Sequence, residues 1–194
     1  MQSFNLKFYL FYKLLNSLFA GVALGSIFVI YAPLPQITYS LGGIILALGA
    51  WILTFFYAKI LASKPYKKIL IFIEIIPFFY VLAYLFFPTS FYGALFVYVM
   101  YQITFIFGGY LVRCETLIFH TTSLIKALDI QKQIGYLLGL GISFLFYFCL
   151  EHFLIKEQKE QVYFLHFLLL FLQGLTFASL LFSLKKGKKC KAMS

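Results

Sequence analysis

Basic residues and long apolar runs alternate along this chain, and this alternation constrains its fold more than any other feature. Six apolar runs divide the sequence, and the gaps between them are by turns basic and poor in net charge. Fourteen of the 16 Lys and Arg residues fall in alternate gaps or at the two ends of the chain. They are Lys7, Lys13, Lys59, Lys64, Lys67, Lys68, Arg113, Lys126, Lys132, Lys185, Lys186, Lys188, Lys189 and Lys191. Because Lys and Arg beside membrane spans stay on the cytoplasmic side, this pattern predicts six spans with both ends of the chain in the cytoplasm.

Composition excludes a water-soluble fold and argues against a nucleic-acid-binding protein. Hydrophobic residues make up 63% of the chain and charged residues 11%, against about 45–50% and about 25% in soluble domains. The net charge is +10, but the basic residues flank apolar runs, which favours anionic lipid headgroups as their partner. We therefore predict an all-α polytopic integral membrane protein, placed in the inner (plasma) membrane of a bacterium, with the lipid bilayer as partner and no nucleic acid.

The six predicted spans fill most of a single transmembrane domain, residues 1–184, and leave no room for a soluble domain. They cover residues 8–31, 37–58, 69–87, 91–112, 134–150 and 162–184. Between the fourth and fifth spans, residues 114–133 carry apolar side chains at helical spacing, which predicts an amphipathic cytoplasmic helix. Residues 185–194 form a basic tail that we also expect in the cytoplasm.

Glu74 is the single position that points most sharply to function, because it is the only carboxyl residue inside a predicted span. It lies six residues beyond Lys68, or about 9 Å along a helix. An ionised carboxylate at that depth is costly and usually faces a polar cavity or a partner. Glu74 is therefore a candidate proton relay in a transport cavity; alternatively, it reaches back to the membrane interface and pairs with Lys67 or Lys68.

Uncharged polar residues in three other spans are further candidates for a transport cavity. Asn16, Gln102 and Gln173 each fall within a different apolar run. A substrate site near the middle of a membrane needs a few such groups. Each residue taken alone is better explained by an interhelical hydrogen bond, but three on separate helices favour a shared cavity. His166, near the outer end of the last span, is a second candidate proton relay, or else an interfacial residue.

Motifs for catalysis, cofactors and metals are absent from the sequence. No paired histidines, nucleophile elbow or phosphate-binding loop occurs. Cys114, Cys149 and Cys190 are too widely spaced for a metal site or a sequence-evident disulfide. We expect no enzymatic activity, no cofactor and no metal, and the catalytic set is empty.

The basic turn between the second and third predicted spans carries the most specific pattern in the chain. Lys64, Lys67 and Lys68 lie in this turn, and Arg113 ends the fourth span. With Asn16 and glycines in the first span, the layout resembles the N-terminal half of a major facilitator superfamily transporter, whose second cytoplasmic turn holds basic residues at these positions. The resemblance implies that the four basic residues form a cytoplasmic gate.

The chain departs from the family's gate motif in its acidic residue and its glycines. Ser63 stands at the acidic position, while Lys59 and Tyr66 stand at the two glycine positions. The family also has two six-helix halves, and this chain has one. The resemblance therefore implies a half-size transporter of an unidentified small solute, paired with a second copy or a second six-span subunit and a candidate for proton coupling.

Two alternatives to that transporter remain open at the level of sequence. The first is the substrate-binding membrane subunit of an energy-coupling-factor-type vitamin carrier, which is also a six-span chain of about this size and uses a small-residue spacing such as that of Gly21 and Gly25. That spacing is common in membrane helices. The second is a membrane scaffold or assembly factor that binds no solute.

Overall fold

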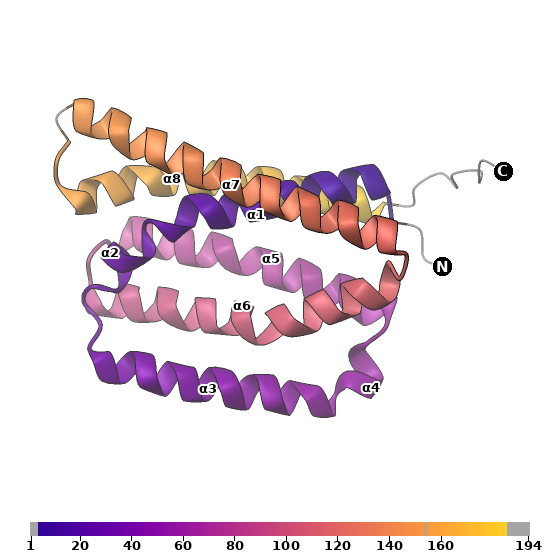
Figure 1. Cartoon of the computed structure of the whole chain (residues 1–194). Helices are drawn as coiled ribbons and strands as arrows, with labels where there is room; N and C mark the ends of the chain where they lie inside the picture. Colours follow the sequence, from indigo (N-terminus) through magenta and orange to yellow (C-terminus); the bar gives the residue numbers. More distant parts are fainter. Residues whose placement is uncertain (1–3, 154, 186–194) are drawn as a thin grey trace.

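Eight helices account for nearly all of the chain in the computed structural model, which describes residues 4–153 and 155–185 (Figure 1). No strand occurs within those two ranges. The helices are α1 (Leu6–Leu24), α2 (Ile27–Tyr31), α3 (Gln36–Phe55), α4 (Tyr57–Ile60), α5 (Ser63–Phe86), α6 (Phe91–Ile118), α7 (Thr122–His152) and α8 (Gln158–Leu184). The predicted all-α class is confirmed for the described residues. Most of the basic tail, residues 186–194, lies outside them.

Five helices, α3, α5, α6, α7 and α8, are long and apolar enough to cross a membrane. This agrees with an integral membrane protein and accounts for five of the six predicted spans. The first predicted span, residues 8–31, is divided between α1 and α2. Neither of these two helices is both long enough and apolar enough to be counted with the five. The helix α1 carries Lys7, Lys13, Asn16 and Ser17, which lower its apolar character. Six spans therefore stay a prediction.

The first span is interrupted by a short turn at Gly25 and Ser26. The Ser26 hydroxyl donates a hydrogen bond to the carbonyl of Ala23, 2.7 Å away, just before α2 begins. After α2, Pro33 and Pro35 prevent the helix from continuing, since proline lacks the backbone N–H that a helix needs. The chain then reverses into α3.

The segment 114–133 differs from the separate amphipathic helix that we predicted. Its first five residues extend α6 to Ile118, and its last twelve open α7 at Thr122. Only Phe119–Thr121 leave the helical conformation. The apolar residues at helical spacing in this segment belong to the ends of two long helices. Glu115 is part of α6 rather than of a separate amphipathic helix.

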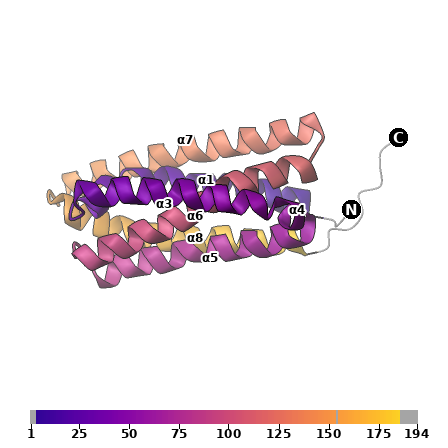
Figure 2. The ribbon, with the colours of Figure 1, turned by 90° about the horizontal axis from the view of Figure 1, so that it is seen from below.

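The helices run side by side in the order α3, α6, α5, α8, α1, α7 (Figures 1 and 2). In this order α1 packs between α7 and α8, while α8 also packs on α5. The backbone N–H of Asn5 donates to the carbonyl of Ser183 over 2.9 Å, so the two ends of the described chain lie at one end of the bundle. A chain that crosses a membrane an even number of times has both ends on the same side, and the position of these two ends agrees with that. Which side of a membrane they face stays a prediction.

Small residues bring α1 and α7 into close contact. A methyl group added at Gly21 would lie 2.5 Å from the backbone oxygen of Tyr136, and one at Gly139 would collide with the backbone oxygen of Leu18. Close backbone approach of this kind replaces the hydrophobic effect as the source of helix association in lipid. The contact fixes the face of α1 that turns away from α7, and that face carries the polar residues described next.

Candidate functional site

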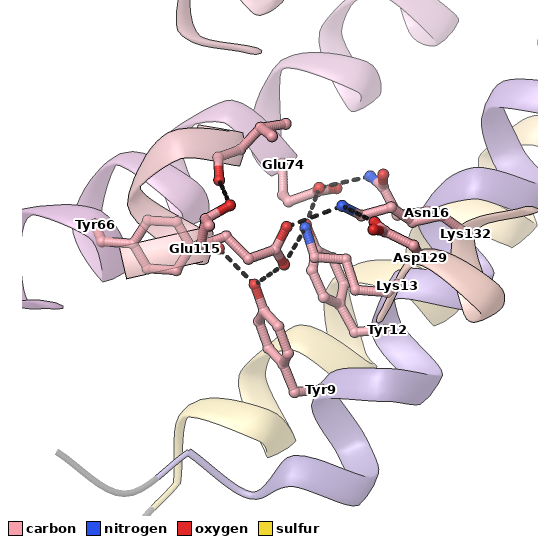
Figure 3. Close-up of polar contacts among 11 residues, drawn as sticks. Tyr9, Tyr12, Lys13, Asn16, Tyr66, Glu74, Glu115, Asp129 and Lys132 are labelled. Atoms are coloured by element: carbon pink, nitrogen blue, oxygen red, sulfur yellow. Dashed lines mark hydrogen bonds and ion pairs between the residues drawn. The ribbon is translucent and has the colours of Figure 1, made fainter. Parts of the chain in front are cut away.

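Glu74 lies near the middle of α5 and is held by side chains from two other helices, of which Figure 3 shows those of α1. It is eleven residues from the start of α5, which corresponds to about 16 Å of helix. The Tyr12 hydroxyl and the Asn16 amide of α1 donate to its Oε1 over 2.5 and 2.7 Å. The Gln173 amide of α8 donates to its Oε2 over 3.2 Å and to its backbone oxygen over 2.7 Å. Glu74 is 4% exposed and forms no ion pair with any described residue.

Glu115, near the end of α6, is held instead by two ammonium groups. Lys13 of α1 lies 2.8 Å from its Oε1, and Lys132 of α7 lies 3.0 Å from its Oε2. The Tyr9 hydroxyl also donates to Oε1 over 2.7 Å and is hydrogen-bonded to the hydroxyl of Tyr66. Glu115 is 3% exposed. The ion pairs of Glu115 join α6 to α1 and α7. The helix α6 makes few other contacts with these two helices.

One face of α1 supplies partners to both carboxylates. Tyr9, Lys13 and Asn16 follow each other at spacings of four and three residues, and Tyr12 lies four before Asn16. Residues at these spacings share one side of a helix. Figure 3 shows the two carboxylates side by side along α1, each in contact with its own side chains of that helix. We call Glu74, Glu115, Lys13 and Lys132 the ionic cluster.

A cavity of about 430 Å³ opens beside the ionic cluster, lined by α1, α2, α5, α6 and α7. Lys13, Asn16, Glu74 and Lys132 form its charged and polar wall. The rest of the lining is largely apolar or aromatic, including Phe19, Pro77, Tyr80, Tyr101 and Phe105. Its volume lies within the range of about 300–1,000 Å³ found for small-molecule sites. The arrangement can bind a small molecule that has one polar end and one apolar end.

The structure brings together three of the four residues predicted for a transport cavity. Asn16, Glu74 and Gln173 form direct hydrogen bonds, and Asn16 and Glu74 line the cavity. Gln102 does not join them. It lies on α6 outside the cavity lining, and its buried side-chain oxygen has no hydrogen-bond partner among the described residues.

His166 lies apart from the ionic cluster. It is seven residues before Gln173 on α8, or about 10 Å along the helix. One of its ring nitrogens lies 2.7 Å from the backbone oxygen of Val162, and its ring stacks on Tyr84 with 4.1 Å between the centroids. Neither of these contacts connects it to Glu74, and its part in a proton relay stays a prediction.

The four residues of the predicted cytoplasmic gate lie in the first turns of α5 and in the last turns of α6. Lys67 lies over the ring of Phe4 at 4.4 Å, and the guanidinium of Arg113 lies 5.8 Å from the ring of Tyr57. Lys64 and Lys68 are exposed. None of the four pairs with a carboxylate among the residues that the structure describes. The alternative pairing of Glu74 with Lys67 or Lys68 is accordingly not seen.

Sequence reasoning missed Glu115, Lys13 and Lys132 as site residues. The two lysines served only as signals of topology, and Glu115 fell in the predicted amphipathic cytoplasmic segment, residues 114–133, outside the spans. The available signal was the helical periodicity on both sides of Phe119, which extends α6 through Glu115. Within the described ranges, no group of three His, Cys, Asp or Glu residues is placed to bind a metal ion.

No protein-family model, no curated protein and no solved structure matches this chain.

Proposed function

We propose that this chain is one half of a membrane transporter for a small solute, and that the cavity beside Glu74 is its substrate site. The observation that carries the proposal is a nearly buried carboxylate at mid-helix, held by α1 and α8 and facing a cavity of about 430 Å³. Carboxylates at membrane depth are costly and mark substrate or ion pathways. Because Glu74 has no fixed cation beside it within ion-pair distance, it is suited to gain and lose a proton during transport.

The proposal includes a sixth span formed by α1 and α2. Together they cover Leu6–Tyr31, which is about 39 Å of helix at 1.5 Å per residue and exceeds the ~30 Å hydrocarbon core. α1 also runs between α7 and α8, both of which are long enough to span. Its polar face turns toward the cavity, where polar groups in a membrane are tolerated.

A second six-span unit completes the transporter in this proposal. A major-facilitator-like transporter has two halves around one site, and a second copy of this chain supplies the simplest partner. Among the long helices, α3 packs mainly on α6, and it leaves large side chains such as Trp51 and Phe55 exposed. Lipid covers such a face equally well, so the partner has to be tested directly.

Uptake into proteoliposomes tests the transport function. Purified protein is reconstituted in vesicles, incubated with a mixture of small metabolites, and the accumulated solutes are identified by mass spectrometry. Accumulation of one or more solutes above that in protein-free vesicles is expected. Failure to accumulate any solute, with and without a proton gradient, contradicts the proposal and favours a scaffold.

Native mass spectrometry of the same preparation distinguishes the two transport architectures. A homodimer, or a complex with another six-span chain, is expected for the half-size transporter. Co-purification with an ATPase module instead favours the substrate-binding subunit of a vitamin carrier. A strict monomer that transports unaided contradicts the two-half architecture.

A further inference from the structure

The ionic cluster contains equal numbers of positive and negative groups. Glu74, Lys13 and Lys132 line the cavity, and Glu115, which lies outside the lining, pairs with both lysines. Asp129, which also lies 3.4 Å from Lys132, has a side chain that is 63% exposed, so solvent screens its charge. Because Glu115 balances one of the two ammonium groups, the cavity wall taken together with Glu115 is close to neutral when both carboxyls are ionised, with separate negative and positive positions.

Both kinds of charge retain hydrogen-bonding capacity toward a ligand. An ionised carboxylate has about four acceptor positions, and three of those on Glu74 are occupied by Tyr12, Asn16 and Gln173. An ammonium group has three donors. Lys13 uses one on a described residue and Lys132 uses two, leaving donors that can meet a carboxylate.

A ligand with a net charge would have no compensating charge in a cavity whose wall is neutral and whose surroundings have a low dielectric constant. A ligand with a single charge leaves either Glu74 or the lysines without a counterpart and brings an unbalanced charge out of water. A ligand that carries both charges and no net charge avoids this cost. The apolar and aromatic remainder of the lining, with Phe19, Tyr80, Tyr101 and Phe105, favours an apolar body on the same molecule.

We propose that the cavity binds a small zwitterion with an apolar side chain, of the amino-acid type, with its ammonium group on Glu74 and its carboxylate on Lys13 and Lys132. This inference rests on the proposed transport function and adds the substrate class. The geometry that carries it is the placement of opposite charges from α1, α5 and α7 on one wall of an otherwise apolar cavity.

A panel of four matched compounds tests the substrate class by isothermal titration calorimetry on the purified protein. Phenylalanine carries both charges, phenethylamine only the cation, 3-phenylpropionate only the anion, and 3-phenylpropanol neither. Phenylalanine is expected to bind at least about tenfold more tightly than each of the others, because each of the others leaves a charged group of the wall unpaired. Equal affinity for phenylalanine and either singly charged analogue overturns the proposal, as does no binding of phenylalanine.

Two substitutions change the charge of the wall in opposite directions. They test whether the ammonium group of the ligand lies on Glu74 and its carboxylate on the two lysines. Glu74→Gln leaves the wall with one net positive charge, and we expect its preference to move to 3-phenylpropionate. Lys132→Gln leaves one net negative charge and is expected to move the preference to phenethylamine. Glu151→Gln, at an exposed residue near the end of α7, is the matched control. It is expected to bind the four compounds in the same order of affinity as the wild type. An unchanged order in both folded variants of the wall contradicts the assignment.

The two proposals fail in different ways. If vesicles accumulate a solute from the metabolite mixture but the zwitterion does not bind, the transport function stands and the substrate class is wrong. If phenylalanine binds with the expected order but no solute is accumulated, the site is a binding site and the transport function is wrong.

Discussion

Glu74 and Glu115 are two almost fully buried carboxylates in the same bundle, and they are held by different kinds of partner. Glu115 lies between two ammonium groups, from α1 and α7. Glu74 receives hydrogen bonds only from uncharged donors, on α1 and α8. A carboxylate between two fixed cations gains little from a further cation, whereas one among neutral donors can still accept a proton or an ammonium group. The comparison therefore favours a structural role for Glu115 and supports the ligand-binding role proposed for Glu74.

Replacing Glu115 is expected to have the largest effect on stability. Glu115→Gln removes the partner of two ammonium groups, one of them on the nearly buried Lys13. Breaking a buried ion pair from one side costs about 3–5 kcal/mol because the remaining charge is uncompensated. The free energy of unfolding in mixed micelles, obtained by titration with a denaturing detergent, measures this loss.

Asp129→Asn is the matched control for Glu115→Gln. It removes another carboxylate that contacts Lys132, but its side chain is largely exposed, and exposed pairs contribute about 0–1 kcal/mol. If the two variants lose the same free energy of unfolding, Glu115 does not act as the structural member of the ionic cluster.

Replacing Glu74 is expected to change transport more than stability. Glu74→Gln keeps an acceptor for the Tyr12 and Asn16 donors and leaves no ion pair broken among the described residues. We expect a loss of no more than about 1–2 kcal/mol from weaker hydrogen bonds to a neutral group. If Glu74 carries the proton, uptake by the variant no longer responds to a pH gradient across the vesicle membrane.

The outcome of the Glu74 experiment is read against wild-type vesicles of equal protein content. Loss of the response to pH with the protein still folded agrees with a proton relay at Glu74. A response that matches the wild type in the folded variant contradicts this role, and a loss of stability as large as that of Glu115→Gln removes the distinction between the two carboxylates.

The sequence predicted the site around Glu74 better than the site around Glu115 for a physical reason. A carboxyl residue in the middle of a long apolar run is conspicuous, because ionised groups are costly at that depth. Asn16 and Gln173 are conspicuous for the same reason. That they reach Glu74 depends on the packing of α5 on α8 and of α8 on α1. Neighbours in space of this kind cannot be obtained from periodicity alone.

Glu115 was missed because it lies where an apolar run ends. The sequence at such a position does not distinguish a helix that ends from one that continues. Arg113, Glu115 and the residues around Phe119 mark the end of the apolar run, and a loop and a continued helix both agree with them. Likewise, Lys13 and Lys132 obey the charge rule for topology whether or not they pair with a carboxylate. The five long apolar helices were predictable, whereas the ion pairs between their ends required the three-dimensional arrangement.

The two glutamines provide the smallest and most specific test of the comparison. Gln173 bonds to Glu74 through its amide nitrogen, whereas no hydrogen bond joins the side chain of Gln102 to another described residue. The buried side-chain oxygens of both glutamines lack a partner among the described residues. Interhelical hydrogen bonds in membranes contribute about 0.6 kcal/mol on average. Gln102→Met, which keeps the volume similar, is therefore expected to change the free energy of unfolding by no more than about 0.6 kcal/mol and to leave uptake unchanged.

Gln173→Met, measured in the same way, is expected to lose more stability than Gln102→Met because it removes a hydrogen bond to a charged group, worth about 1.5–3 kcal/mol in proteins. It is also expected to weaken uptake, since Gln173 helps to fix the carboxylate that faces the cavity. If Gln102→Met instead abolishes uptake while Gln173→Met does not, the substrate path follows α6 rather than the wall formed by Glu74. That result would move the functional site away from the ionic cluster altogether.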